Sequence, residues 1–158
     1  MKRDDLGTIA NARTPEQIAH MKTTVGRGIC PFCKIDLTKN KPLGEWLHWW
    51  VWENPFPYPH HERHIVIPTK RHVTSLGELT PDEMVEWLTI VQWAETHFNM
   101  PGGALVLRFG DPKHNAGTLA HFHWQIQVPD GKHSAFAVFS KGPAWQAAID
   151  LLKTEANP

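Results

Sequence analysis

Apolar and polar residues alternate most regularly between Ala120 and Val128. Side chains of a β-strand point alternately to opposite faces, so this pattern predicts a strand with two different faces. The apolar face consists of Phe122, Trp124, Ile126 and Val128, and the polar face of His121, His123, Gln125 and Gln127. The apolar face is expected to pack into the core. A core strand does not need a row of two imidazoles and two amides, although a half-exposed strand can carry one without any function.

The segment before this strand, Asp111–Thr118, is polar and rich in residues that form turns. Successive backbone N–H groups in such a loop can form a concave site for an anion. A phosphate group bound beside an imidazole is therefore the first chemical hypothesis.

Two helices have clear N-terminal signals. Thr14 is a suitable N-cap with Pro15 at the first helical position, which predicts a helix to about Thr23. Residues 80–83 form a capping box that also contains a proline at the first helical position, and they predict a long helix. A last helix is predicted from about 143 to 153.

Further strands are predicted over 45–53, 63–68, 104–109 and 135–139. Three prolines in 54–59 remove hydrogen-bond donors, so this segment is predicted to be an extended loop that carries aromatic residues. Residues 1–13 are polar and are expected to be loosely held. The order of elements, α, β, β, α, β, β, β, α, indicates an α+β fold with a mainly antiparallel sheet.

The composition of the 158-residue chain argues against several classes of function. Lys plus Arg and Asp plus Glu number 16 each, so no global field attracts nucleic acid or an anionic membrane surface. A phosphate ligand therefore needs a local site. The first residues lack an apolar signal region, and no run reaches the length of a membrane span. We expect a soluble, cytoplasmic protein with a single globular domain.

The pair Cys30-x-x-Cys33 allows two hypotheses. The pair could be a dithiol redox site, which requires the first cysteine to be exposed at a helix N-terminus that lowers its pKa. It could also be half of a tetrahedral zinc site, which requires two further ligands from elsewhere in the chain. Histidine is the usual complement, and the chain has 11 of them.

The chain resembles the histidine-triad superfamily in the order and spacing of its motifs. The matching segments are Pro59-His60-His61, then His64-Ile65-Val66-Ile67-Pro68 with Lys70-Arg71-His72-Val73, and, after a long helix, Asn115-x-Gly117-Thr118-x-x-His121-x-His123-x-Gln125. The cysteine pair lies where zinc-containing members carry theirs. Glutamine replaces the third histidine of His-x-His-x-His, and this variant resembles the galactose-1-phosphate uridylyltransferase and diadenosine tetraphosphate phosphorylase branches. By this resemblance residues 28–158 form a histidine-triad-like domain, and residues 1–27 form an N-terminal arm and helix.

The resemblance implies a catalytic role for the polar face of the strand. His123 would attack the α-phosphorus of a nucleotide and become a nucleotidyl-imidazole. Gln125 would donate its amide to a phosphoryl oxygen, and unlike histidine it cannot deliver a proton. The remaining implied contacts are Thr118, Asn115 and the Gly117 loop amides on non-bridging oxygens, Asn54 on the nucleoside, and Phe56 stacked on the base.

The resemblance also implies a cofactor and partners. A structural zinc ion would be bound by Cys30, Cys33, His72 and His121. The partners would be a nucleotide, a phosphate or phosphorylated acceptor, and a second copy of the chain in a homodimer. The expected function is that of a nucleotidyl transferase or phosphorylase. The alternatives are a hydrolase that releases a nucleoside monophosphate and a nucleotide-binding protein without turnover. A zinc-stapled module for nucleic acid does not fit the neutral charge.

Overall fold

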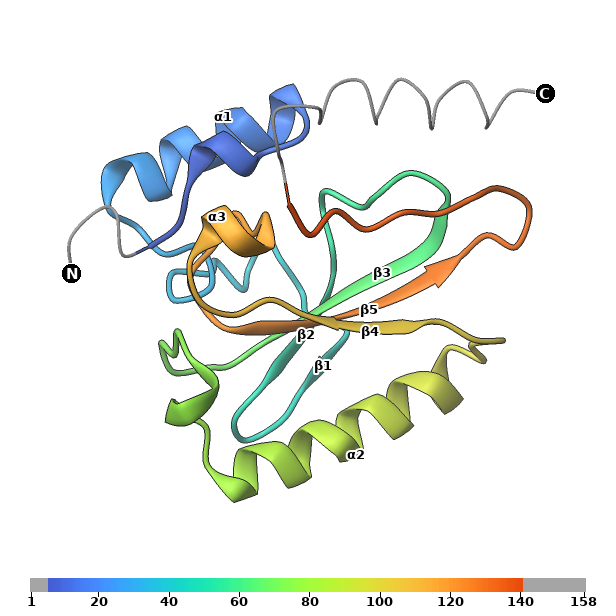
Figure 1. Ribbon diagram of the computed structural model, residues 1–158. Helices are drawn as coiled ribbons and strands as arrows, with labels where there is room; N and C mark the ends of the chain where they lie inside the picture. The colour runs from blue at the N-terminus through green and yellow to red at the C-terminus, as the bar shows by residue number, and fades with distance from the viewer. Residues whose placement is uncertain (1–5, 141–158) are drawn as a thin grey trace.

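The computed structural model describes residues 6–140, which form an antiparallel five-stranded sheet in the order β1-β2-β3-β5-β4. The long helix α2 covers one face of the sheet, and α1 and the short helix α3 lie over the other (Figure 1). The strands are β1 (Gly44–Glu45), β2 (Trp50–Glu53), β3 (His61–Pro68), β4 (Ala104–Leu107) and β5 (His123–Pro129). The helices are α1 (Pro15–Thr23), α2 (Pro81–His97) and α3 (Pro112–Asn115), with short 3-10 turns at Ile9–Asn11, Val25–Arg27 and Leu76–Glu78. This arrangement confirms the predicted α+β class.

The main hydrophobic core lies between the sheet and α2. Ile65 and Ile67 of β3 and Ile126 and Val128 of β5 pack with Ile90 and Ala94 of α2, as do the buried Trp49 and Phe122. Each buried isoleucine, valine or phenylalanine side chain among them contributes about 1.5–3 kcal/mol by leaving water. The apolar face of the strand was therefore predicted correctly, and its polar face must point away from α2.

The predicted capping box positions the start of α2. The Thr80 side chain accepts a hydrogen bond from the Glu83 backbone, and the Glu83 carboxylate accepts one from the Thr80 backbone N–H. Two backbone N–H groups that the helix cannot satisfy internally are thereby paired. The predicted cap of α1 is also present, because Thr14 accepts from the backbone N–H of Gln17.

The described part of the N-terminal arm is held firmly, contrary to the prediction for residues 1–13. Leu6 is buried, and Gly7 forms an isolated β-bridge with Leu119. The φ angle of Gly7 is +144°, and a Cβ atom there would lie 2.1 Å from the carbonyl oxygen of Thr118, so only glycine fits. The arm therefore packs against the chain just before His121.

The predicted strand 45–53 is in fact a hairpin. β1 and β2 are separated by a tight turn in which the Trp46 N–H donates to the Trp49 carbonyl. The Glu86 carboxylate of α2 accepts from the backbone N–H groups of Leu47 and His48, which stabilises the turn from outside the hairpin.

Smaller differences concern the other predicted elements. β4 ends at Leu107 instead of Phe109, and the polar loop contains α3. Residues 135–139 form no strand, so that prediction was wrong; the Val138 carbonyl instead accepts a hydrogen bond from Arg108. The predicted last helix lies outside the described residues. No helix within residues 6–140 is both long and apolar enough to cross a membrane.

Candidate active site and metal cluster

The polar face of β5 opens into a cavity on the α1 side of the sheet. In the β3–β5 pairing Gln125 lies opposite Val66, and Gln127 lies opposite His64. Side chains on this face point away from α2 because their neighbours Ile126 and Val128 point towards it. The residues that line the cavity come from the N-terminal arm and α1, the connector that holds Pro31 and Phe32, the Pro-rich loop after β2, β3, the residue after β4, the loop before β5, and β5 itself.

His123 has a defined tautomer. Its Nδ1 lies 2.8 Å from the carbonyl oxygen of His121, and because a carbonyl can only accept, Nδ1 carries the proton. The other ring nitrogen, Nε2, therefore has a free lone pair. It lies 3.4 Å from the Nε2 amide of Gln125, which can donate to it weakly. His123 lines the cavity, so the unprotonated nitrogen is available to a ligand there.

The amide of Gln125 is oriented by two further hydrogen bonds. Its Oε1 accepts from Nε2 of His64 and from the side-chain amide of Gln127, both at 2.9 Å. His64 can donate from Nε2 because its Nδ1 accepts from the backbone N–H of Tyr58 at 3.3 Å. With its oxygen occupied, Gln125 must direct its N–H group towards His123. The hydrogen bonds thus run in one direction: Tyr58 donates to His64, His64 donates to Gln125, and Gln125 donates to His123.

The imidazoles of His123 and His64 are both neutral at physiological pH. Burial lowers the pKa of His123 to about 4. The hydrogen bond to the His121 carbonyl opposes this shift to a smaller extent, and the charge of Arg108 makes the smallest contribution, which lowers the pKa. Burial likewise lowers the pKa of His64 to about 4. A neutral His123 keeps its lone pair, as a nucleophile requires.

The structure gathers most of the predicted substrate-binding residues around this cavity. Asn54, Phe56, Gly117, Thr118, His123 and Gln125 all line it. Asn115 does not: its Oδ1 accepts from the Gly117 backbone, and its Nδ2 donates to the carbonyls of Phe109 and Gly110. The Asn115 side chain shapes the loop that carries Gly117 and Thr118.

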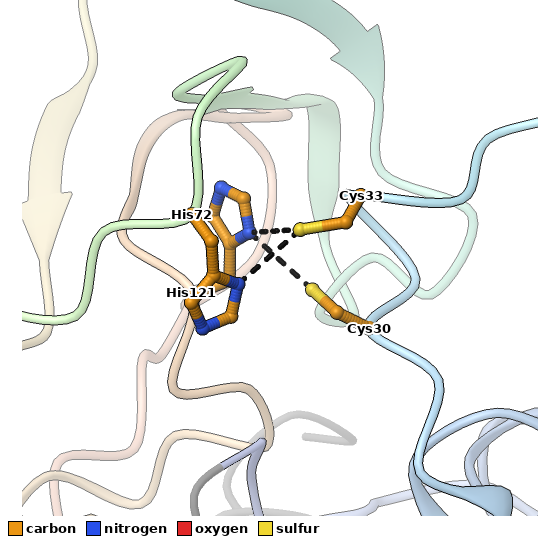
Figure 2. Close-up of side chains that lie close together, drawn as sticks. All are labelled: Cys30, Cys33, His72 and His121. Carbon is orange, nitrogen blue, oxygen red and sulfur yellow. Dashed lines mark hydrogen bonds between the residues drawn. The ribbon is translucent and has the colours of Figure 1, made fainter. Parts of the chain in front are cut away.

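The four predicted metal ligands form a second cluster next to the cavity. The side chains of Cys30, Cys33, His72 and His121 point towards one another from three separate segments (Figure 2). Their ligand atoms all lie within 4.8 Å of one another, and three Sγ–Nδ1 distances are 3.2, 3.3 and 3.4 Å. A tetrahedral zinc ion with these ligands requires sulfur–nitrogen separations of about 3.5 Å. The donor set therefore fits zinc.

A hydrogen bond from outside the cluster orients the ring of His121. The Nε2–H of His121 donates to the Thr69 carbonyl at 2.9 Å, which leaves Nδ1 unprotonated and directed at the thiols. Such outer hydrogen bonds are typical of metal-binding histidines. Burial lowers the pKa of His121 to about 3, and burial together with Cys33 raises the pKa of Cys30 to about 12. A buried thiol with a raised pKa is unlike the nucleophilic cysteine of a redox dithiol.

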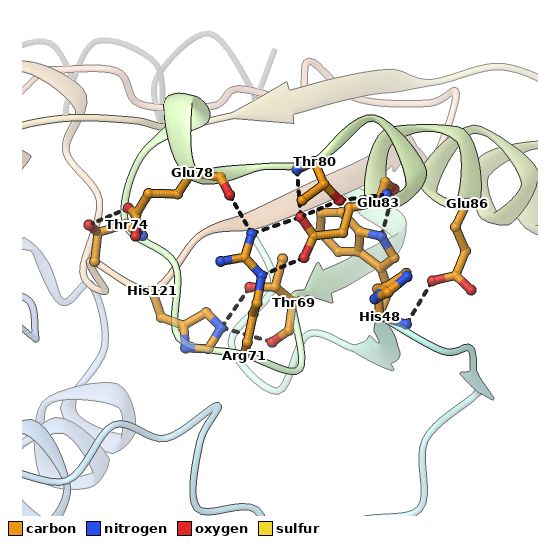
Figure 3. Close-up of polar contacts among 10 residues, drawn as sticks. His48, Thr69, Arg71, Thr74, Glu78, Thr80, Glu83, Glu86 and His121 are labelled. Carbon is orange, nitrogen blue, oxygen red and sulfur yellow. Dashed lines mark hydrogen bonds and ion pairs between the residues drawn. The ribbon is translucent and has the colours of Figure 1, made fainter.

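An ion pair ties the segment that carries Thr69 and His72 to α2. Arg71 donates to both carboxylate oxygens of Glu83 and to the carbonyl of Glu78, and the Glu83 side chain is 2% exposed (Figure 3). The hydrogen bonds of Arg71 are the largest cause of a Glu83 pKa lowered to about 2. The same carboxylate accepts from the Thr80 backbone N–H at the start of α2. Glu83 therefore stabilises both the helix start and the segment that carries His72.

Comparisons with known proteins identify the fold. The sequence matches no family model, and no curated protein matches it. Among solved structures, a histidine triad nucleotide-binding protein from Candida albicans matches with a TM-score of 0.53 at 20% identity, over 78% of this chain and 94% of that one. The protein has the histidine-triad fold.

Two more solved structures match this chain with similar TM-scores. A hypothetical protein from Leishmania major has a TM-score of 0.53 at 17% identity, over 79% of this chain and 93% of that one. A hypothetical histidine triad nucleotide-binding protein from Sulfolobus tokodaii has a TM-score of 0.51 at 18% identity, over 80% and 91%. These matches confirm the predicted fold, while the chemistry has to be argued from the site.

Two arginines that line the cavity were missed at the level of the sequence. Arg13 lies directly before the cap of α1, and Arg108 lies directly after β4. Arg13 lies at the start of a helix and Arg108 at the end of a strand. A charged residue at such a boundary is the sequence feature that could have indicated them.

Proposed function

We propose that this protein transfers a nucleotidyl group through a covalent nucleotidyl-His123 intermediate, formed at the α-phosphate of a nucleotide substrate. One observation carries the proposal: the Nδ1–H of His123 is bonded to a carbonyl, and its unprotonated Nε2 lies beside the Gln125 amide in the cavity. A neutral imidazole is a good nucleophile at pH 7. The substrate would be a dinucleoside polyphosphate, a sugar nucleotide or a similar nucleotide.

The other cavity residues would position this substrate. The backbone N–H groups around Gly117 and the Thr118 hydroxyl would bind non-bridging oxygens of the α-phosphate. Asn54 would contact the ribose, and Phe56 would stack on the base. We assign Asn115 to holding the loop in shape, because its side-chain amide is already engaged with backbone groups.

The first step exchanges one bond at phosphorus for another. The Nε2 lone pair of His123 forms an N–P bond, the P–O bond to the leaving group breaks, and its electron pair stays on the departing oxygen. The N–H group of Gln125 shifts its hydrogen bond from His123 to a phosphoryl oxygen, where it stabilises charge. In the second step an acceptor oxygen attacks phosphorus, and the N–P electrons return to Nε2.

The glutamine favours an anionic acceptor over water. An amide can orient a phosphoryl group, but it cannot take a proton from water or give one to a leaving group. A phosphate or phosphate ester is already deprotonated and needs no such help. Transfer to phosphate is therefore our first proposal, and hydrolysis is the alternative.

A zinc ion would be structural in this scheme. Cys30, Cys33, His72 and His121 would hold it, and with four protein ligands it would have no open position for substrate. When bound, the ion would cross-link the connector after α1 to the segment that leads into β5. The chain's own residues carry out every chemical step.

We further propose that the protein is a homodimer. The exposed Val85 and Leu88 of α2, at 68% and 51% exposure, offer an apolar surface for a second copy. Sedimentation of the wild-type protein and of Leu88→Glu should distinguish a dimer from a monomer. A wild-type protein that sediments as a monomer at micromolar concentration would exclude this assembly.

The proposed reaction is tested by trapping the intermediate. The protein is incubated with radiolabelled nucleotides, including dinucleoside polyphosphates and sugar nucleotides, quenched, and analysed by mass spectrometry with peptide mapping. We expect label on His123, discharged faster when inorganic phosphate is added, with the nucleotidyl group recovered on the phosphate. Gln125→His is expected to shift discharge towards water.

Two results would contradict this proposal in different ways. No covalent adduct with any nucleotide, in the presence of measurable nucleotide binding, would identify a binding protein without turnover. Full turnover in phosphate-free buffer, with a plain mononucleotide as product, would identify a hydrolase.

A further inference from the structure

Positive charge gathers in the cavity although the chain as a whole is neutral. Arg13 and Arg108 both line the cavity that contains His123 and Gln125. No aspartate or glutamate among the described residues lines it, and within residues 6–140 neither arginine belongs to an ion pair. In contrast, Arg63 and Arg71 at other places in the fold are paired with Glu53 and Glu83.

The two guanidinium groups meet at one aromatic side chain. The Cζ atom of Arg13 lies 3.6 Å from the centroid of the Tyr58 ring, and Nη2 of Arg108 donates to the Tyr58 hydroxyl at 3.0 Å. The other acceptors are the carbonyl of Phe56 for Arg13 and the carbonyls of Asn115 and Val138 for Arg108. All of these acceptors are uncharged, so the two positive charges are held in place without being neutralised.

This arrangement has an electrostatic cost that a ligand would relieve. Burial lowers the pKa of Arg13, and the neighbouring charge of Arg108 adds to that effect, while Tyr58 opposes it. Guanidinium groups remain charged in proteins and match phosphate oxygens in a bidentate geometry. Two of them in a cavity without carboxylates form a site for a phosphate chain.

We infer that Arg13 and Arg108 form a second phosphate subsite, which binds the phosphate groups of the leaving group or acceptor next to the α-phosphate attacked by His123. The substrate class is thereby narrowed to nucleotides with at least one phosphate beyond the reacting one. This inference rests on the proposed function, and it adds a specificity role for two residues, one of them in the N-terminal arm.

The subsite also explains why position 125 does not need to hold a general acid. When the N–P bond to His123 forms, the bridging P–O bond breaks and its electron pair stays on the terminal oxygen of a phosphate. The guanidinium groups stabilise that negative charge, so no proton has to be supplied. A glutamine at position 125 is sufficient for such a leaving group, whereas an alcohol or amine would require a proton donor.

The first experiment measures the subsite without any chemistry. Binding of inorganic pyrophosphate to the full chain is measured by calorimetry, and zinc content is followed in parallel. We expect Arg13→Gln and Arg108→Gln each to weaken binding about 10- to 100-fold. This is the effect of losing one hydrogen bond to a charged group. Arg13→Lys should retain part of the affinity, and Arg27→Gln, at an exposed arginine after α1, should retain all of it.

His123→Ala should bind pyrophosphate like the wild type, since the subsite does not include the nucleophile. Arg13→Gln is the more decisive variant, because Arg108 also supports the loop through Asn115. Unchanged pyrophosphate binding by Arg13→Gln and by a folded Arg108→Gln would overturn the subsite.

The second experiment compares two leaving groups. Adduct formation on His123 is followed with pooled nucleoside 5′-triphosphates, which release pyrophosphate, and with the matching 5′-phosphorimidazolides. Solvent protonates the free ring nitrogen of a phosphorimidazolide, so neutral imidazole departs without a proton from the protein. Arg13→Gln should slow the first reaction about 10- to 100-fold and the second by less than about threefold. Equal slowing of both reactions would refute the subsite and leave the proposed function standing. No adduct from either compound with the wild type would refute the proposed function, whereas pyrophosphate binding still tests the arginines.

Discussion

Two histidines that lie two residues apart belong to the Cys/His cluster and to the cavity, and they differ in their tautomer. His121 carries its proton on Nε2, because this nitrogen donates to the Thr69 carbonyl, and it presents Nδ1 to the thiols of the cluster. His123 carries its proton on Nδ1, because this nitrogen donates to the His121 carbonyl, and it keeps Nε2 free. Burial keeps both rings neutral. A backbone carbonyl therefore decides which nitrogen of each ring is available.

The surroundings of the free nitrogen differ as well. Nδ1 of His121 faces two sulfur atoms and a second imidazole in a closed set of four ligands, whereas Nε2 of His123 faces one amide and a cavity. Phe32 separates the two environments, with its ring centroid 5.5 Å from that of His121 and 5.2 Å from that of His123. The same residue type is thus suited to metal coordination just before β5 and to nucleophilic attack at the first residue of β5.

The largest expected effect separates chemistry from structure. His123→Ala should lower the rate of nucleotidyl transfer by at least about 10⁴-fold, because the proposed covalent bond forms on Nε2 of His123. Zinc content and the unfolding midpoint should remain those of the wild type. Rates are measured with the substrate found in the trapping screen, and His97→Ala, at an exposed histidine of α2, is the matched control. Residual activity close to that of the wild type would assign the nucleophile to another residue.

The second largest effect concerns zinc binding and stability instead of chemistry. Cys33→Ser should remove zinc and lower the free energy of unfolding by about 5 kcal/mol, since the binding energy of a structural zinc site is folding energy. Metal analysis should give about one zinc per chain for the wild type, and chelation should reproduce the loss. A native protein without metal, or with a Cys30–Cys33 disulfide, would refute the zinc assignment.

The sequence was sufficient for those parts of both sites that depend on local patterns. Alternation along β5 separated its two faces, and the Thr80 capping box located the start of α2. Both signals involve neighbours in the chain, whose geometry is nearly the same in every fold. The pairing of His123 with a carbonyl two residues earlier is local in the same sense.

Contacts between distant segments could not be predicted in this way. The tautomer of His121 depends on Thr69, 52 residues away, and the turn within the 45–53 hairpin depends on Glu86 of α2. Residues 6–13 have a polar composition, yet Leu6 and Gly7 are fixed by the segment before His121. The convergence of Arg13 and Arg108 on Tyr58 likewise joins three segments that no local pattern connects.

The third effect concerns the anchor of the metal cluster and depends on pH. The folded-state pKa of Glu83 is about 2, against an ordinary value of 4.5, so its ion pair with Arg71 stabilises the protein fully above pH 4.5. That contribution is lost as the pH falls towards 2. Glu83→Gln should cost about 1–2 kcal/mol at pH 7, a value limited by the exposure of Arg71, and only a small part of that at pH 2.

Glutamine is the informative replacement because it can still cap α2 at Thr80. Urea unfolding of both proteins at several pH values measures the difference, and Glu95→Gln, on an exposed part of α2, is the control. A difference that persists unchanged at low pH would assign the role of Glu83 to packing instead of charge.

The smallest expected effect concerns nucleotide binding by Asn54 in the cavity. The Oδ1 of Asn54 accepts from the Phe56 backbone, and its Nδ2 lies 3.4 Å from the unprotonated Nδ1 of His64, to which it can donate weakly. Only Nδ2 is therefore free to exchange its partner for a substrate hydroxyl. Asn54→Ala should weaken nucleotide binding by about 0.5–1.5 kcal/mol, the value of one neutral hydrogen bond, and should leave zinc content unchanged.

Asn40→Ala serves as the control for this substitution, because Asn40 is exposed in a turn and its side chain donates to the Asp36 carbonyl. Binding is measured by calorimetry in the His123→Ala background, so that turnover does not interfere. The same titration with the 2′,3′-dideoxy form of the nucleotide should abolish the difference between the proteins with and without Asn54→Ala, because the hydroxyl partner is then missing from both complexes. A difference that survives in the dideoxy series would mean that Asn54 acts through the Phe56 loop and not through the ribose.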